Sequence, residues 1–417
     1  MRTSLVVALL CAACKSAPNE SARPPDASVT ARPIVSAKPA PKPSASVAPA
    51  PTCMPEIDGW VHYAELDARC DFAMPPSAAA LPPPIEWERC TGDLAGLKRC
   101  RQMRVIGFDG FDRSVAGQNR GRVQLLFERV CHKPRRRVLV AAEADGAVLA
   151  AMASRANIET TGCHARPVFI GGGRYLYQLV GELTDASANP EALDLGGSLR
   201  DAPVLMHRLT GGQQHEQIAA SSRSWGTLDG GVNMGPLGKH TESVHAGAVS
   251  SNLAIFGDTA LFVDDETATL MAWTKARGVF PLHKLEAPNE RVTGIAFNDD
   301  LVVWSAYPPR TKPGGECTLV AAKLSLQPPR IIPKRVTTFS CPRDKDRPWA
   351  LGSGYAAHAT NDPSILLVRV ADGTTWTIKT AGAPLFVSES ELLFELTHGG
   401  IARMPIAAIR AADAAVP

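Results

Sequence analysis

Residues Ile295–Tyr307 read IAFNDDLVVWSAY: a short apolar run, a polar break at Asn298–Asp300, and a second apolar run, Leu301–Trp304. The second run consists of aliphatic and aromatic side chains of the kind that pack on a pleated, buried surface. Two such runs around a compact polar turn are typical of a β-hairpin. We therefore expect Leu301–Trp304 to be an inner buried strand and Asn298–Asp300 to be an exposed turn. On this interpretation the stretch is scaffold and is a poor place to look for chemistry.

The same order of apolar run, small polar turn and apolar run recurs at Val168–Leu179 (VFIGGGRYLYQL), Ala254–Asp264 (AIFGDTALFVD) and Leu385–Leu396 (LFVSESELLFEL). A degenerate strand–turn–strand repeat in a chain of 417 residues is typical of a β-propeller or a related repeat fold. Turn residues spaced by about ten residues also favour an all-β domain. We predict an all-β, β-propeller-like domain, and the uneven spacing of the repeats leaves its size open between five and seven blades.

Other segments are less regular. Val204–Leu209 and Ile218–Ala220 resemble strands, and we expect them to complete the blade that begins at Val168. Ser221–Thr241 is rich in glycine and gives no clear pattern. Met404–Ala415 has helical periodicity and predicts a short terminal helix.

The amino terminus has the features of an export signal. A basic second residue is followed by the apolar run Leu5–Leu10 and by Cys11-Ala12-Ala13, directly before Cys14. This segment resembles a bacterial lipoprotein signal, although Cys11 stands where that family usually has Leu. The resemblance implies cleavage before Cys14 and acylation of its thiol and new amino group, and Lys15 in place of Asp implies sorting to the outer membrane. The alternative is an ordinary secretory signal cut at the same bond.

Residues 15–52 contain 9 Pro, 9 Ala and 6 Ser, and the first aromatic residue beyond them is Trp60. A segment so poor in large apolar side chains predicts a disordered spacer with polyproline II character. The expected organisation is therefore a signal peptide at 1–13, the lipidated Cys14 with its linker at 14–52, an irregular disulfide-stapled lead-in at 53–101, and the propeller-like domain at 102–417.

Cysteine usage fits an exported protein. Of ten cysteines, Cys11 leaves with the signal and Cys14 takes the lipid, so that an even number remains for disulfides. The connectivity does not follow from sequence, and nearest-neighbour pairing gives one possibility: Cys53–Cys70, Cys90–Cys100, Cys131–Cys163 and Cys317–Cys341. Because no two cysteines have C-x-x-C spacing, a zinc ribbon or a thioredoxin-like redox site is disfavoured.

The stretches Trp87–Cys90 and Cys100–Met103 resemble the opening segment of lipobox-bearing, β-propeller-like exported bacterial lipoproteins of unknown function. The resemblance implies that the paired cysteines pin the first blade strand. It also implies a propeller fold and a location in the cell envelope, and it implies no activity.

No arrangement of residues predicts a catalytic site, a cofactor or a metal site. His215, His240 and His245 lie near Glu242, but their spacing fixes no set of metal ligands. The pair Asp299-Asp300 is more typical of turn capping than of Ca²⁺ binding. The formal net charge of +3 argues against a nucleic-acid binder.

Two classes of function follow. The first is a non-catalytic binding or scaffold module that is tethered to the lipid bilayer through Cys14 and holds a protein or glycan on one propeller face. The second is an envelope hydrolase or lyase with its site in the central channel, which would place carboxylates, histidines or arginines around the axis. We favour the first class because the sequence contains no recognisable catalytic set.

Overall fold

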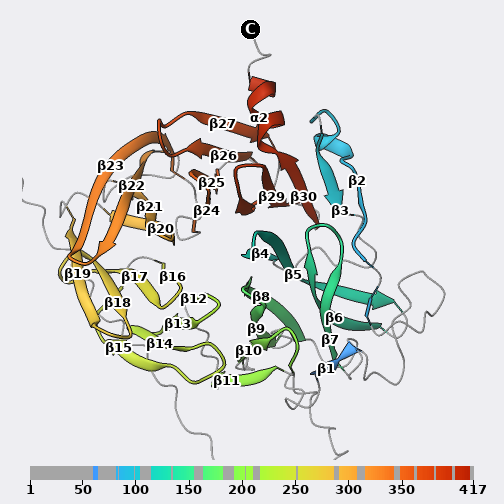
Figure 1. Cartoon of the computed structure of the whole chain (residues 1–417), viewed down its shortest axis with the longest axis horizontal. Helices are drawn as coiled ribbons and strands as arrows, with labels where there is room; N and C mark the ends of the chain where they lie inside the picture. The colour runs from blue at the N-terminus through green and yellow to red at the C-terminus, as the bar shows by residue number, and fades with distance from the viewer. Residues whose placement is uncertain are drawn as a thin grey trace, which may run out of the picture. The chain divides into compact units, whose positions relative to one another are not determined.

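Strands that follow one another along the chain pair in antiparallel sheets, and the described residues contain seven such sheets. The structure is a computed structural model, and it describes residues 60–63, 81–82, 84–97, 99–103, 114–132, 135–154, 163–181, 192–201, 203–209, 217–249, 252–285, 291–307, 315–341, 348–360, 364–379, 382–396 and 400–413. Figure 1 shows the sheets following one another around a common centre, as in a seven-bladed β-propeller. The predicted fold class is confirmed.

We number the blades along the chain and name their strands from the centre outward. Blade one contains β4 (Val115–Asn119), β5 (Arg122–His132), β6 (Arg135–Glu143), β7 (Val148–Ser154) and β1 (Trp60–His62). Blade two contains β8 (Cys163–Gly171), β9 (Arg174–Gly181), β10 (Ala192–Ser198) and β11 (Val204–Leu209). Blade three contains β12 (Gln217–Ala220), β13 (Ser224–Leu228), β14 (Val232–Pro236) and β15 (Glu242–His245).

Blade four contains β16 (Ala254–Phe256), β17 (Thr259–Asp264), β18 (Thr269–Thr274) and β19 (Gly278–Lys284). Blade five contains β20 (Arg291–Asn298), β21 (Leu301–Tyr307), β22 (Glu316–Leu326) and β23 (Pro329–Ser340). Blade six contains β24 (Ala350–Gly352), β25 (Tyr355–Ala359), β26 (Ser364–Arg369) and β27 (Thr375–Lys379). Blade seven contains β28 (Pro384–Val387), β29 (Glu391–Glu395), β30 (Ile401–Pro405), β3 (Arg101–Met103) and β2 (Trp87–Arg89). The predicted terminal helix is α2 (Ile406–Asp413), and a 3₁₀ turn, η3 (Gly92–Leu94), lies between β2 and β3.

Apolar side chains of neighbouring blades form the core. The described residues make seven buried clusters, one at each blade interface. Trp304 of blade five and Phe280 of blade four share one cluster, and Trp225 of blade three and Leu176 of blade two share another. Because each sheet is covered on both faces, a strand such as β17 is buried at every residue, and the alternation of apolar and polar residues disappears.

The innermost strands contact one another in the order β4, β8, β12, β16, β20, β24, β28 and back to β4, which closes the ring. Close approach around the centre requires glycine at some positions. A Cβ on Gly117 would lie 1.7 Å from the carbonyl oxygen of Ile170, and a Cβ on Gly352 would lie 2.0 Å from that of Val387. Both sites place an inner strand directly against the inner strand of the next blade.

The four repeats found in the sequence are inner hairpins: β8–β9, β16–β17, β20–β21 and β28–β29. Leu301–Trp304 is almost fully buried as expected, but it lies in the second strand from the centre because β20 is the innermost strand of blade five. The exposed turn is Asp299-Asp300, and Asn298 ends β20.

The expectation that Ile218–Ala220 completes the blade that begins at Val168 is wrong. Ile218–Ala220 belongs to β12, which pairs with β13 and begins blade three, whereas β11 completes blade two. Ser221–Thr241, which shows no clear pattern in the sequence, contains β13 and β14 of that third blade. Inner and outer strands have the same apolar character here, so that sequence does not tell the last strand of one blade from the first strand of the next.

Blade seven is built from two distant parts of the chain. Strands β28, β29 and β30 come from its carboxyl-terminal side, and β3 and β2 come from residues 87–103. The joint is short, since β3 pairs with β30 at Arg101↔Arg403 and Gln102↔Ala402. The segment expected as an irregular lead-in thus supplies strands to the ring, and the expected boundary at residues 101 and 102 falls inside β3. The hairpin completes the last blade and does not pin the first one.

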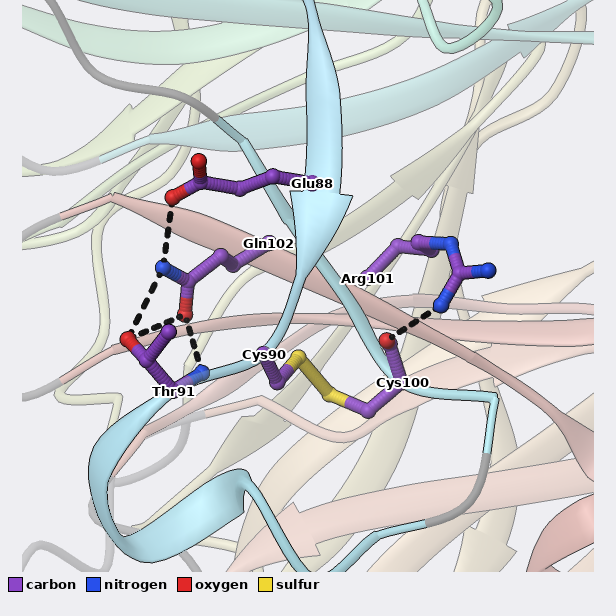
Figure 2. The surroundings of a disulfide bond; sticks show 6 residues. All are labelled: Glu88, Cys90, Thr91, Cys100, Arg101 and Gln102. Atoms are coloured by element: carbon purple, nitrogen blue, oxygen red, sulfur yellow. Dashed lines mark hydrogen bonds between the residues drawn. A yellow bond between two sulfur atoms is a disulfide. The ribbon is translucent and has the colours of Figure 1, made fainter.

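Figure 2 shows how the β2–β3 hairpin is held together. Cys90 follows β2 and Cys100 precedes β3, and a disulfide joins them with their Cα atoms 5.5 Å apart. Beside it, Gln102 Nε2 donates to Glu88 Oε1 at 2.9 Å, and Gln102 Oε1 accepts from the Thr91 N–H at 3.1 Å. The covalent bond and these hydrogen bonds hold two three-residue strands in register.

The hairpin and β30 also contact blade one. Trp87 Nε1–H and Arg403 Nη1–H both donate to the carbonyl oxygen of Ala144, at 2.9 and 3.0 Å. The Arg403 guanidinium lies over the Trp87 ring, 4.5 Å from its centroid, in a cation–π contact. Nearby, the Ile85 N–H donates to the carbonyl oxygen of Gly146 at 2.8 Å. Residues before β3 therefore join the last blade to the first.

The predicted disulfides Cys90–Cys100 and Cys317–Cys341 are confirmed. The second joins β22 to the residue that follows β23. The other predicted sites stay predictions, because Cys14, Cys53 and Cys70 lie outside the described residues, as do the side chains of Cys131 and Cys163.

We expect the double substitution Cys90→Ala and Cys100→Ala to lower the free energy of unfolding by about 3 kcal/mol, because the unfolded chain loses a loop constraint. Loop entropy alone predicts a slightly larger loss for Cys317→Ala with Cys341→Ala, since the sequence separation is 24 residues instead of 10. Only the first variant should also accelerate amide hydrogen exchange in β3 and β30, because only it loosens the joint of the ring.

Urea denaturation and hydrogen-exchange mass spectrometry measure the two effects separately. Equal protection of β3 and β30 in both variants would contradict a closing role for the Cys90–Cys100 bond.

Candidate binding site

The strands nearest the centre carry few charges. Their described residues contain no Asp or Glu, and Arg166 on β8 and Arg291 on β20 are their only Lys or Arg residues. Hydrolases and lyases usually need a carboxylate or histidine that moves a proton at the site. A channel enzyme would therefore have to take any carboxylate from outside these strands, whose described residues include one histidine, His164 on β8.

A pocket of about 470 Å³ lies between blades four and five, where three turns of the chain meet. This volume is within the range of small-ligand sites. The turns are those between β16 and β17, between β20 and β21, and between β22 and β23. Four of the seven lining residues are apolar, and the full lining is Phe256, Thr259, Phe297, Asp299, Leu324, Leu326 and Gln327.

The apolar wall follows from strand geometry. Phe256 ends β16 and Phe297 is the penultimate residue of β20, and their rings meet edge to face with centroids 5.6 Å apart. Leu324 and Leu326 are two residues apart on β22 and so share one face of that strand. Phe256 retains 39% exposure, whereas Phe297 and Leu324 are buried. The pocket therefore presents an exposed aromatic ring at the edge of an apolar core.

The polar part of the pocket comes from a recurrent turn. In five blades, the first residue after the innermost strand has a positive φ, at Arg120, Gly172, Gly257, Asp299 and Ser353. This left-handed conformation suits glycine, and Asp tolerates it better than most residues do. Among these five blades, only blade five has a carboxylate at that position: Asp299, whose φ is 42°.

The Asp299 carboxylate has no hydrogen bond or ion pair with any residue that the structure describes. Its neighbours differ. Asp258, in the equivalent turn of blade four, pairs with Arg223 at 3.1 Å, and Asp300 lies 4.0 Å from Lys323. One carboxylate at the wall of the pocket is thus left to interact with solvent or with a ligand.

The histidines considered as metal ligands take another role. His245 lies 3.3 Å from the Asp264 carboxylate of blade four and packs on the ring of Phe262. His240 is exposed, and His215 lies outside the described residues. Among the residues that are described, no group of three or more His, Cys, Asp or Glu side chains is arranged to hold a metal ion.

A second histidine–carboxylate pair lies on the outer strands of blade two. Asp194 is fully buried on β10, accepts a hydrogen bond from Gln178 Nε2 at 3.0 Å, and faces His207 of β11. His207 Nδ1 lies 3.7 Å from Asp194 Oδ2, which is an ion-pair distance and longer than a hydrogen bond. Asp194, and more weakly Asp229, raises the pKa of His207 above its usual value, and partial burial opposes this. The pair is structural, since it balances a buried charge between two strands.

Sequence reasoning missed the pocket and placed no function at Ile295–Tyr307. Phe297 and Asp299 of that stretch line the pocket, so its turn belongs to the candidate site, and the expectation that the stretch is a poor place to look for chemistry stays a prediction. The available signal was Asp299 directly after the first strand of its hairpin, where two other repeats have glycine and the repeat Leu385–Leu396 has serine. Its partners lie in blade four and on β22, and sequence does not show that these segments are neighbours.

No known protein family matches the chain, and no curated protein matches it. Among solved structures, a selenomethionine-substituted virginiamycin B lyase from Staphylococcus aureus is 10% identical, with 74% of this chain and 99% of that chain covered and a TM-score of 0.45. YCF48 from Cyanidioschyzon merolae is 10% identical, with 74% of this chain and 98% of that chain covered and a TM-score of 0.42. BamB from Moraxella catarrhalis is 13% identical, with 74% of this chain and 88% of that chain covered and a TM-score of 0.35. The propeller assignment rests on the strand order above, and these likenesses say nothing about what the chain binds.

Within the part of the chain that the structure describes, no helix is long and apolar enough to cross a membrane.

The His207–Asp194 pair should make stability depend on pH. Because the folded-state pKa of His207 is raised, its contribution is fully present below the unfolded pKa of about 6.5 and is lost as pH rises through the folded pKa. Wild type should exceed His207→Asn in free energy of unfolding by up to about 1 kcal/mol at low pH, since His207 is partly exposed.

Denaturant titrations between about pH 5.5 and about pH 8.5 measure this difference. A difference between wild type and His207→Asn that stays constant over this range would show that protonation of His207 does not stabilise the fold.

Proposed function

We propose that this protein is a membrane-tethered, non-catalytic binding module of the cell envelope, and that the pocket between blades four and five holds a segment of a protein partner. The observation that carries the proposal is the combination of an exposed ring, Phe256, with an unpaired carboxylate, Asp299, in one apolar pocket. Apolar pockets with a few placed polar groups are the usual form of a binding site.

The scaffold suits binding better than catalysis. Seven interface clusters fix each blade against its neighbours, so that turns at the surface are held by a rigid frame. The innermost strands contribute no described carboxylate to a channel site. These two observations support a module that presents a preformed surface, and they disfavour a hydrolase or lyase in the channel.

The tether rests on the sequence alone. Cleavage before Cys14 and acylation of that residue would anchor the protein stably, because two or more acyl chains hold a protein on a bilayer where one does so only marginally. The Pro/Ala/Ser-rich residues 15–52 would then serve as a spacer between the lipid and the propeller. We place the protein in the bacterial envelope, at the outer membrane, on the same basis.

For the tether, we expect cells that express the full chain to incorporate labelled palmitate into it, and Cys14→Ser to abolish the label because the acceptor thiol is lost. Cys11→Ser is the matched control and should keep the label, since Cys11 is removed with the signal. Equal labelling of the wild type and Cys14→Ser would refute lipidation at this residue.

For binding, a photo-reactive benzoylphenylalanine at position 256 should form a discrete cross-linked product in intact cells of the source organism, because the side chain would touch the bound partner. The same residue at position 204 is the matched control. Val204 is similarly exposed, at 48% against 39% for Phe256, but it lies on the outer strand of blade two, away from the pocket. The same products from both positions, or no product from position 256, would refute binding at the pocket.

A further inference from the structure

We infer that the pocket between blades four and five binds a peptide segment in which an apolar side chain lies beside a lysine or arginine. The inference rests on the proposed function and specifies the chemistry of the partner. It follows from the position of one carboxylate in a lining whose other members are four apolar and two neutral polar residues.

The apolar part of the ligand fills the pocket. Phe256 is exposed, and Phe297, Leu324 and Leu326 complete the apolar part of the lining. Burial of an apolar side chain against this wall is favourable at about 25 cal/mol per Å² of surface removed from water. The lining offers two neutral polar residues, Thr259 and Gln327, too few to replace the many hydrogen bonds of a glycan.

The charged part of the ligand follows from desolvation. Any group that fills the pocket removes water from one side of Asp299, and a carboxylate that loses water without a partner is destabilised. The described structure supplies no cation for it: Arg223 is engaged by Asp258, and Lys323 lies at the carboxylate of Asp300. A ligand with its own positive charge compensates Asp299, whereas an acidic ligand adds repulsion.

A peptide fits this geometry because the site is at the surface. Asp299 lines the pocket and is exposed, so a chain that inserts one side chain can continue over the turn while its neighbouring residue reaches Asp299. The equivalent turns of the other blades carry arginine, glycine or serine at this position and would not select for a basic residue.

The test uses the full purified chain and three synthetic peptides: one with a central phenylalanine flanked by arginines, one with the same phenylalanine flanked by glutamates, and one with arginines around alanine. Fluorescence anisotropy of labelled peptides measures each dissociation constant. We expect the first peptide to bind at least about fivefold more tightly than either of the others. Its advantage over the glutamate peptide should shrink between about 0.05 M and about 0.5 M salt.

Asp299→Asn should remove most of the preference for arginine over glutamate, and it keeps the turn because asparagine also tolerates a positive φ. Asp300→Asn is the matched control, since that carboxylate is adjacent but does not line the pocket, and it should retain the preference. Phe256→Ala should weaken binding of both phenylalanine peptides. Thermal unfolding of each variant checks that the fold is kept.

Two results would overturn the inference. Equal, Phe256-dependent binding of the arginine and glutamate peptides would show that the pocket binds apolar side chains without a charge preference, and the proposed function would stand. If Asp300→Asn lost the preference for arginine over glutamate while Asp299→Asn kept it, the charge preference would come from Asp300 and not from Asp299. Failure of the proposed function itself is read separately, from cross-linking at position 256.

Discussion

A ring of sheets closes where the last sheet contacts the first, and here two three-residue strands, β2 and β3, contribute to that contact beside an apolar cluster shared by blades seven and one. The carbonyl oxygen of Ala144 receives hydrogen bonds from Trp87 and Arg403, so that one acceptor in blade one holds both parts of blade seven. Two three-residue strands make too few backbone hydrogen bonds to form a stable hairpin by themselves, and the Cys90–Cys100 disulfide holds this one together. The other interfaces join sheets that follow one another along the chain, and each has its own buried apolar cluster.

Much of the fold was predictable, because the inner hairpins repeat. Val168–Leu179 and Ile295–Tyr307 show the pattern clearly, since their strands combine long apolar runs with a tight polar turn. Blade three was not predictable, because Gly226 and Gly235 occupy positions where a neighbouring backbone leaves no room for a side chain. Glycine at a close contact removes the apolar residue that would have marked the strand.

The candidate site was not predictable for a different reason. Phe256, Asp299 and Leu326 come from three turns in two blades, and their proximity depends on which strand is innermost in each blade. Sheets that are buried on both faces show apolar runs without alternation, and such runs do not reveal their order from the centre. The residue types at the turn were visible in the sequence, but their common pocket appears only when the blades are assembled.

The composite seventh blade also bears on how the gene for this fold can be rearranged. Apart from β1 at the outer edge of blade one, the described chain enters the ring at Trp87 and leaves it after Pro405, and both points lie in the same sheet. A circular permutant that joined these two sides and opened instead at the turn Arg120-Gly121 would make blade seven from one continuous segment. In such a protein, blade one would be the blade built from both ends of the chain, and the Cys90–Cys100 disulfide would lie within a continuous blade.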